Sequence, residues 1–74
     1  MEYEYIHFVE VERKPKTSVF ELRNSRSGDR LGVVKWYPAW RQYCYFPDRT
    51  QILSAGCLAD IQDFIGWADG QRGL

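Results

Sequence analysis

The residues with the clearest capacity for chemistry are a single histidine, His7, and two cysteines, Cys44 and Cys57. A thiolate beside an imidazole can act as a nucleophile. A structural zinc site needs four ligands in close pairs, whereas these cysteines are thirteen residues apart. Cys57 fits better as a small core residue, and His7 as a half-buried histidine in a strand. Asp60 and Asp63, one helical turn apart, are typical of a solvated helix face. We therefore predict a non-enzymatic protein without catalytic residues, metal or cofactor.

The most unusual stretch is KWYPAWRQYCYFP, residues 35–47, in which six of thirteen residues are aromatic. Aromatic cross-strand pairs are a normal way to stabilise a small sheet, which favours a hairpin that belongs to the core. Tyrosine, tryptophan and arginine also dominate binding hot spots, which favours a contact surface. The second interpretation predicts Tyr37, Trp40 and Arg41 as anchors, with Lys35 and Gln42 at the rim. The sequence leaves both interpretations open.

Period-two alternation of β-branched and aromatic residues predicts four strands that position this stretch. We place a first strand at 1–12, a linker at 13–17, a three-stranded meander at 18–47, a helix at 54–69 and a frayed tail at 70–74. Ser54 predicts the helix N-cap and Gly70 its end, and the apolar stripe of the helix is Leu58, Ile61, Ile65 and Ala68. The order predicts a single α+β domain over 1–74, an antiparallel sheet of about four strands with one C-terminal helix packed on one face (β-β-β-β-α).

Within the meander, Pro38-Ala39 predicts a two-residue loop, because proline suits the second position of a type I turn. The predicted register then places Trp36 opposite Arg41, Val34 opposite Tyr43 and Gly32 opposite Tyr45. We expect this side to face the core. The other side carries Lys35, Tyr37, Trp40 and Gln42 near the tip. A slip of one residue would exchange the two sides.

The 74 residues carry no net charge, with ten Lys and Arg against ten Asp and Glu. Residues 13–49 hold nine Lys and Arg against three acids, a net charge of +6, so the rest of the chain has a net charge of −6. The acidic, alternating N-terminal stretch does not read as a signal peptide, and no apolar run reaches the ~20 residues of a membrane span. Two cysteines are few for a secreted domain. We expect a cytoplasmic protein with reduced thiols and no membrane partner.

The run W-Y-x-x-W-R-Q-Y-C-Y-F-P, followed by A-G-C-L-x-D-I-x-D-F-I at residues 55–65, resembles a group of small uncharacterised proteins of phages, prophages and bacterial genomes. The resemblance spans about residues 19–68 and does not include the acidic strand at 1–12. It carries over no activity and no catalytic residue. It implies a small phage or bacterial protein in the bacterial host cytosol that engages a host macromolecule.

We therefore expect a binding protein that docks on a host protein through the aromatic and arginine hairpin. A second candidate surface is the acidic strand with Glu2, Glu4, Glu10 and Glu12, which would meet a basic partner. One alternative is single-stranded nucleic-acid binding, because a basic and aromatic sheet face can stack bases. Another is binding of a nucleotide-like small ligand. Homo-oligomerisation through an exposed sheet face or edge also stays open.

Overall fold

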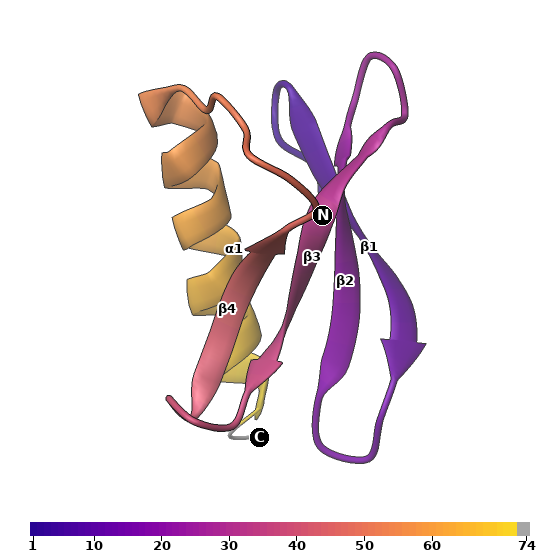
Figure 1. Cartoon of the computed structure of the whole chain (residues 1–74). Helices are drawn as coiled ribbons and strands as arrows, with labels where there is room; N and C mark the ends of the chain where they lie inside the picture. Colours follow the sequence, from indigo (N-terminus) through magenta and orange to yellow (C-terminus); the bar gives the residue numbers. More distant parts are fainter. Residues whose placement is uncertain (73–74) are drawn as a thin grey trace.

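The computed structural model describes residues 1–72 and shows one open antiparallel sheet with one helix on one of its faces (Figure 1). The four strands follow one another in space in the order of the chain. This confirms the predicted α+β architecture with four strands and a C-terminal helix. The elements are β1 (Ile6–Arg13), β2 (Ser18–Asn24), β3 (Arg30–Tyr37), β4 (Gln42–Pro47) and α1 (Ala55–Arg72).

The aromatic ring of Phe64 joins the helix to the sheet. It stacks on Phe8 of β1, with ring centroids 3.8 Å apart and planes 3° apart, and meets Phe20 of β2 edge-on at 4.9 Å. Fully burying a side chain of this kind is worth about 1.5–3 kcal/mol. The remaining buried side chains come from the same face of the sheet and the inner stripe of α1. They are Ile6, Leu22, Val34, Tyr43, Ile61 and Ala68.

The helix begins where the sequence predicts and ends later. Ser54 Oγ accepts a hydrogen bond from the backbone N–H of Cys57 at 3.2 Å, which confirms the N-cap. The predicted end at Gly70 and the frayed tail from residue 70 are wrong for residues 70–72, because α1 continues to Arg72. Residues 73–74 of the predicted tail lie outside the described residues. The placement of Leu58 in the inner stripe is also wrong, since its side chain is 54% exposed. Cys57 lies one turn before Ile61 and therefore takes the inward position instead.

The first strand is shorter at its start than predicted, and the chain before it folds back. The predicted strand covered residues 1–12, but the chain bends at residues 4–5 and β1 starts at Ile6. Phe8 N–H then donates to the carbonyl of Met1 at 2.9 Å, beside a bridge between Glu2 and His7. Residues 1–3 thus cover part of the outer edge of β1 and satisfy backbone groups that an edge strand leaves open. Of the predicted linker at 13–17, Arg13 still belongs to β1, and residues 14–17 form the tight turn of the β1–β2 hairpin.

The β3–β4 hairpin has a four-residue loop, so the predicted two-residue loop is wrong. Trp36 lies opposite Tyr43 and Val34 opposite Tyr45, with residues 38–41 outside the ladder. Trp40 N–H donates to the carbonyl of Tyr37 at 3.2 Å, which closes a turn longer than the sequence suggests. The register differs from the prediction by two residues on β4. Because two residues is one full period of a strand, the two faces are as predicted.

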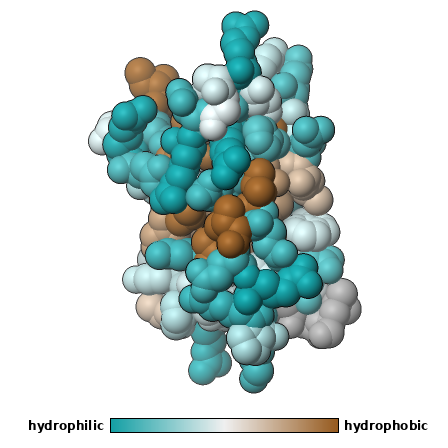
Figure 2. All heavy atoms as spheres, turned by 90° about the vertical axis from the view of Figure 1, so that its right-hand side faces the viewer, coloured by the Kyte–Doolittle hydropathy of each residue, from teal (hydrophilic) through white to brown (hydrophobic). Residues whose placement is uncertain are grey.

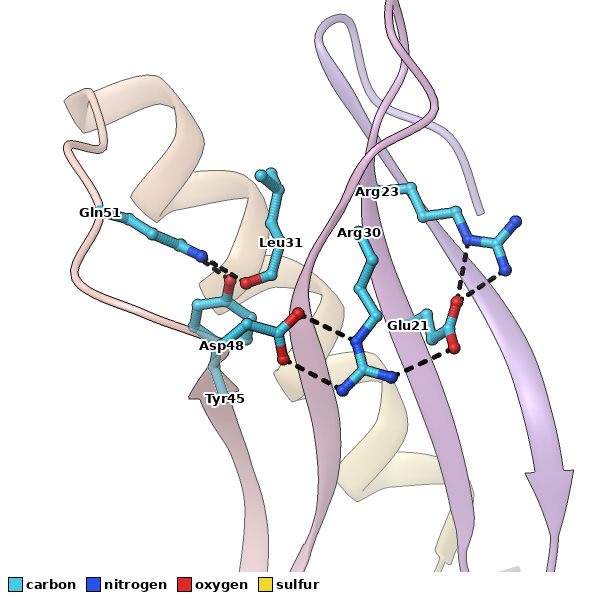
Figure 3. Close-up of polar contacts among 7 residues, drawn as sticks. All are labelled: Glu21, Arg23, Arg30, Leu31, Tyr45, Asp48 and Gln51. Carbon is cyan, nitrogen blue, oxygen red and sulfur yellow. Dashed lines mark hydrogen bonds and ion pairs between the residues drawn. The ribbon is translucent and has the colours of Figure 1, made fainter.

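Gly32 is the place where this sheet tolerates no side chain. A Cβ atom at Gly32 would lie 2.5 Å from the carbonyl oxygen of Phe46 and 2.8 Å from the ring of Tyr45. The Tyr45 ring occupies that space and donates its hydroxyl to Gln51 Oε1 at 3.0 Å. Gln51 in turn donates to the carbonyl of Leu31, which also accepts from Asp48 N–H. Gly32 therefore lets Tyr45 and the loop after β4 close on β3 (Figure 3).

Replacing Gly32 tests this close approach. We expect Gly32→Ala to lower the free energy of unfolding by about 1–3 kcal/mol, because a rigid backbone oxygen stands in the way of the added methyl group. Gly66→Ala is the matched control, since it adds the same group to α1 where nothing lies within 4 Å. It should stabilise the protein by up to about 1 kcal/mol. Urea unfolding of both variants gives the comparison, and equal stabilities would contradict it.

Tyr3 makes the stability depend on pH in the alkaline range. Its hydroxyl donates to Asp63 Oδ2 of α1 at 2.8 Å, and burial together with this hydrogen bond raises the pKa of Tyr3 from 10.0 to about 12. The folded state thus favours the neutral phenol, so this contribution is complete below pH 10 and is lost as the pH rises through 12. We expect the stability difference between wild type and Tyr3→Phe to shrink between pH 10 and pH 12. Urea unfolding across that range measures it, and a constant difference would show that Tyr3 is not the titrating group.

Candidate interaction surface

The face of the sheet that points away from α1 is not covered by any other element among residues 1–72. A row of side chains crosses its middle, one from each strand in register: Val9, Glu21, Val33 and Phe46. All four are half-buried. Figure 2 views the molecule from the side away from the helix and shows hydrophobic side chains gathered in the middle, with hydrophilic ones around them. We call this surface the open face.

Aromatic side chains gather at the end of the open face near the β3–β4 loop. The ring of Tyr37 meets Trp40 edge-on at 5.1 Å and Phe46 at 5.9 Å. Lys35 Nζ lies 4.7 Å from the centre of the Phe46 ring, which is a cation–π contact. Trp40 is 66% exposed although its ring rests on Tyr37. We call these four residues the hairpin cluster; their arrangement holds one large apolar side chain out toward solvent.

The structure brings three of the five predicted hairpin residues into this cluster, Lys35, Tyr37 and Trp40. Gln42 is exposed and pairs with Tyr37 across the ladder, so it lies at the border of the cluster. Arg41 is exposed in the loop, where its backbone takes the left-handed conformation with φ 52°. It does not lie opposite Trp36 as the predicted register had it. The sequence prediction missed Phe46 as a member, although its alternation with Cys44 and Gln42 does place it on this side.

A network of ion pairs lies at the other end of the open face (Figure 3). Arg23 reaches Glu21 at 2.6 Å, and Arg30 makes two bonds of 3.0 Å to Asp48 and one of 3.4 Å to Glu21. Hydrogen bonding to Asp48 raises the pKa of the Arg30 guanidinium. Arg30 reaches this side because the β2–β3 ladder shifts register between Leu22 and Arg23. The sequence prediction missed this network, because no pattern along the chain shows the bulge.

The four predicted acidic residues are all exposed but lie apart. Glu10 pairs with Phe20 in register and is therefore on the helix side, whereas Glu12 pairs with Val19 on the open side. Hydrogen bonds from Ser18 and Arg13 lower the pKa of Glu10, and Lys14 lies 4.0 Å from Glu12.

Glu2 lies in the segment that folds back on β1, and Glu4 lies in the bend before it. The structure thus divides the acidic strand between two faces and supplies two of its carboxylates with local cations.

The candidates for chemistry are also separated in space. Cys44 pairs with Lys35 on the open side, and Cys57 lies beneath the other face at the start of α1; both thiols are free. His7 Nδ1 is 3.0 Å from Ser25 Oγ, which gives the imidazole a local partner. Within residues 1–72 no three His, Cys, Asp or Glu side chains are placed to hold a metal ion together.

Comparisons of the chain with family models, with curated proteins and with solved structures find no match. In the described part of the chain no helix has both the length and the apolar character that crossing a membrane requires. The function must therefore be argued from the surface described above.

The loop conformation of Arg41 gives a test of how the tip is built. A left-handed conformation costs a residue with a side chain roughly 1–2 kcal/mol, while glycine accepts it and loses some entropy on folding. We expect Arg41→Gly to unfold at the same or a higher urea concentration than wild type. Arg41→Val should lower the free energy of unfolding by about 1–2 kcal/mol, because β-branched residues avoid positive φ. A valine variant as stable as the glycine variant would contradict the assigned conformation.

Proposed function

We propose that this protein is a non-enzymatic binding protein that docks on another protein through its open face, with the hairpin cluster as the anchor. The observation that carries the proposal is Trp40, a large aromatic side chain that is exposed yet packs edge-on against Tyr37, whose ring in turn packs against Phe46. An anchor that is already ordered loses little conformational entropy on binding. Tryptophan, tyrosine and arginine are also the residues that alanine scanning most often finds at hot spots.

The size of the protein fits this use. A typical stable interface covers about 800 Å² on each partner, which is a modest share of the 5338 Å² surface of the chain. The side chains buried in residues 1–72 form a single small core that α1 and the sheet fill. Outside this core, aromatic side chains gather at the hairpin cluster, while other exposed hydrophobic side chains, such as Ile52, Leu58 and Trp67, lie elsewhere on the surface.

We further propose, from the resemblance to phage, prophage and bacterial proteins, that the partner is a host protein in the bacterial cytosol. Binding would then act by covering a working surface of that host protein, because a chain of 74 residues has little else to contribute. Lys35 and Arg41 would border the contact and Gln42 would supply hydrogen bonds at its rim.

Two alternative functions each have one observation in their favour. The exposed ring of Trp40 could stack on a base of a single-stranded nucleic acid. A cleft of about 340 Å³ between the β1–β2 turn and the end of α1, lined by Lys16, Tyr43 and Trp67 among others, could take a nucleotide-like ligand. The C-terminal end of a helix repels anions, and Asp69 is close by through its bond to Tyr43 N–H, so this cleft is the weaker site.

Replacing Trp40 tests the proposal. Wild type, Trp40→Ala and Tyr5→Ala would be used side by side to capture proteins from nuclease-treated bacterial lysate. Tyr5 is the matched control, because it is 64% exposed and precedes β1 instead of lying at the hairpin tip. We expect a protein that wild type and Tyr5→Ala retain and Trp40→Ala loses by tenfold or more, about 1.4 kcal/mol. The melting temperature of Trp40→Ala should stay near that of wild type.

Two results would contradict the proposal. A large drop in the melting temperature of Trp40→Ala would place Trp40 in the stabilising core. Capture that depends on nucleic acid, or that Trp40→Ala leaves unchanged, would favour the stacking surface or another contact.

A further inference from the structure

The cations of the open face lie toward its two ends. Lys35 stands at the hairpin end, and Arg23 and Arg30 stand at the other end. Between Arg30 and Lys35 the strand β3 advances five residues, which is about 16 Å at 3.3 Å per residue. Val9, Val33 and Phe46 lie in the middle. The surface thus has apolar side chains around the ion-paired carboxylate of Glu21 at its centre. Lys35 lies at one end, and Arg23 and Arg30 lie at the other, where Asp48 pairs with Arg30.

The cations at the two ends can still take a ligand. Among the described residues Lys35 has no carboxylate within 4.0 Å and only the Phe46 ring beneath its ammonium group. Arg23 donates from Nε and Nη2 to Glu21, and a guanidinium has five N–H donors. Arg23 therefore keeps donors for a second carboxylate, while Arg30 is largely used by Asp48 and Glu21.

The carboxylate of Glu21 determines which kind of ligand can lie across the centre of the open face. Its carboxylate is only 18% exposed and is compensated by Arg23 and Arg30. A second negative charge placed over it would compete for the same two guanidinium groups. The centre therefore disfavours a ligand with charge along its whole length, and it favours one whose charge is confined to its ends.

We propose that the partner presents to the open face a protein segment that is apolar in the middle and acidic at both ends. This inference rests on the proposed docking function and names the chemistry of the partner. In an extended segment the two acidic positions lie about five residues apart, so that one reaches Lys35 and the other Arg23. The apolar side chains between them cover Val33 and Phe46.

The same charges disfavour two other ligands of the open face, a polynucleotide and a second copy of this chain. A polynucleotide carries a phosphate at every nucleotide, so it cannot keep negative charge away from Glu21. A second copy of this chain, packed face to face about a two-fold axis, would bring the two central Glu21 side chains toward each other and set cationic ends near cationic ends. Either arrangement places like charges close together, and the acid-ended segment avoids this repulsion.

Synthetic peptides test the inference with the full chain. The first peptide has two glutamates, five central residues with valine and phenylalanine, and two glutamates. The second replaces the glutamates by lysines. The third has the composition of the first with the glutamates in the centre and the apolar residues at the ends. A twelve-nucleotide oligothymidine is the fourth probe. Titration of ¹⁵N-labelled protein followed by amide chemical shifts gives affinity and location together.

We expect the acid-ended peptide to bind about tenfold or more tightly than the other three probes, with shifts on β2, β3 and β4. Its affinity should fall with added salt and fall again in Lys35→Glu, while Lys16→Glu, a change in the β1–β2 turn, should leave it near wild type. Equal binding of the lysine-ended or acid-centred peptide overturns the inference, as does preference for the oligonucleotide, shifts elsewhere on the protein, or no binding by the acid-ended peptide. A host protein captured through Trp40 would leave the docking proposal standing in each of these cases.

Discussion

The ring of Phe64, stacked on Phe8 and set edge-on to Phe20, is the contact on which the rest of the structure depends. It holds α1 against β1 and β2 from the middle of the helix. At the far end of the helix, Asp69 accepts a hydrogen bond from the backbone N–H of Tyr43 at 2.8 Å, on the edge strand β4. The single helix thus crosses the sheet and seals one face. Residues 1–72 contain no second helix for the other face, so within them the sheet itself must make that face stable in water.

The open face carries a charged residue, Glu21, at its centre. An exposed sheet face made only of valine and aromatic residues would pair with its own kind, and a charged residue in the middle is a common defence. Glu21 fills that role here. Its ion pairs with Arg23 and Arg30 offset the free-energy cost of desolvating its carboxylate. The apolar area is divided as a result. At the hairpin end Trp40 and Tyr37 stand beside Lys35, with Arg41 in the loop.

The sequence predicts elements of the fold well where one local pattern decides them. Alternation places three strands within residues 18–47, where β2, β3 and β4 lie, and Ser54 marks the start of α1 because a hydroxyl cap is a local signal. It fails where residues distant in the chain decide. The bend at residues 4–5 accompanies a hydrogen bond between Met1 and Phe8 of β1. Leu58 is exposed because the side of α1 that carries Phe64 packs on the sheet.

The candidate site divides in the same way. Lys35, Tyr37 and Gln42 are found from the sequence because the faces of a hairpin depend only on whether the register shift is odd or even. An error of two residues in the loop therefore leaves them on the predicted side. The Glu21–Arg30–Asp48 network could not be found, because it joins β2, β3 and the residue that follows β4 through a bulge. No spacing along the chain predicts that Arg30 turns to the open face.

The fold also decides whether the basic middle and the acidic ends of the chain cancel. Asp60, Asp63 and Asp69 belong to α1, on one side of the sheet, whereas the cations of β2 and β3 lie on the other side. The sheet stands between them. On the helix side α1 presents carboxylates, whereas on the open face Arg23 and Arg30 are paired with Glu21 and Asp48, and among the described residues Lys35 has no carboxylate within 4.0 Å. Such a molecule turns in the field of a charged partner before contact.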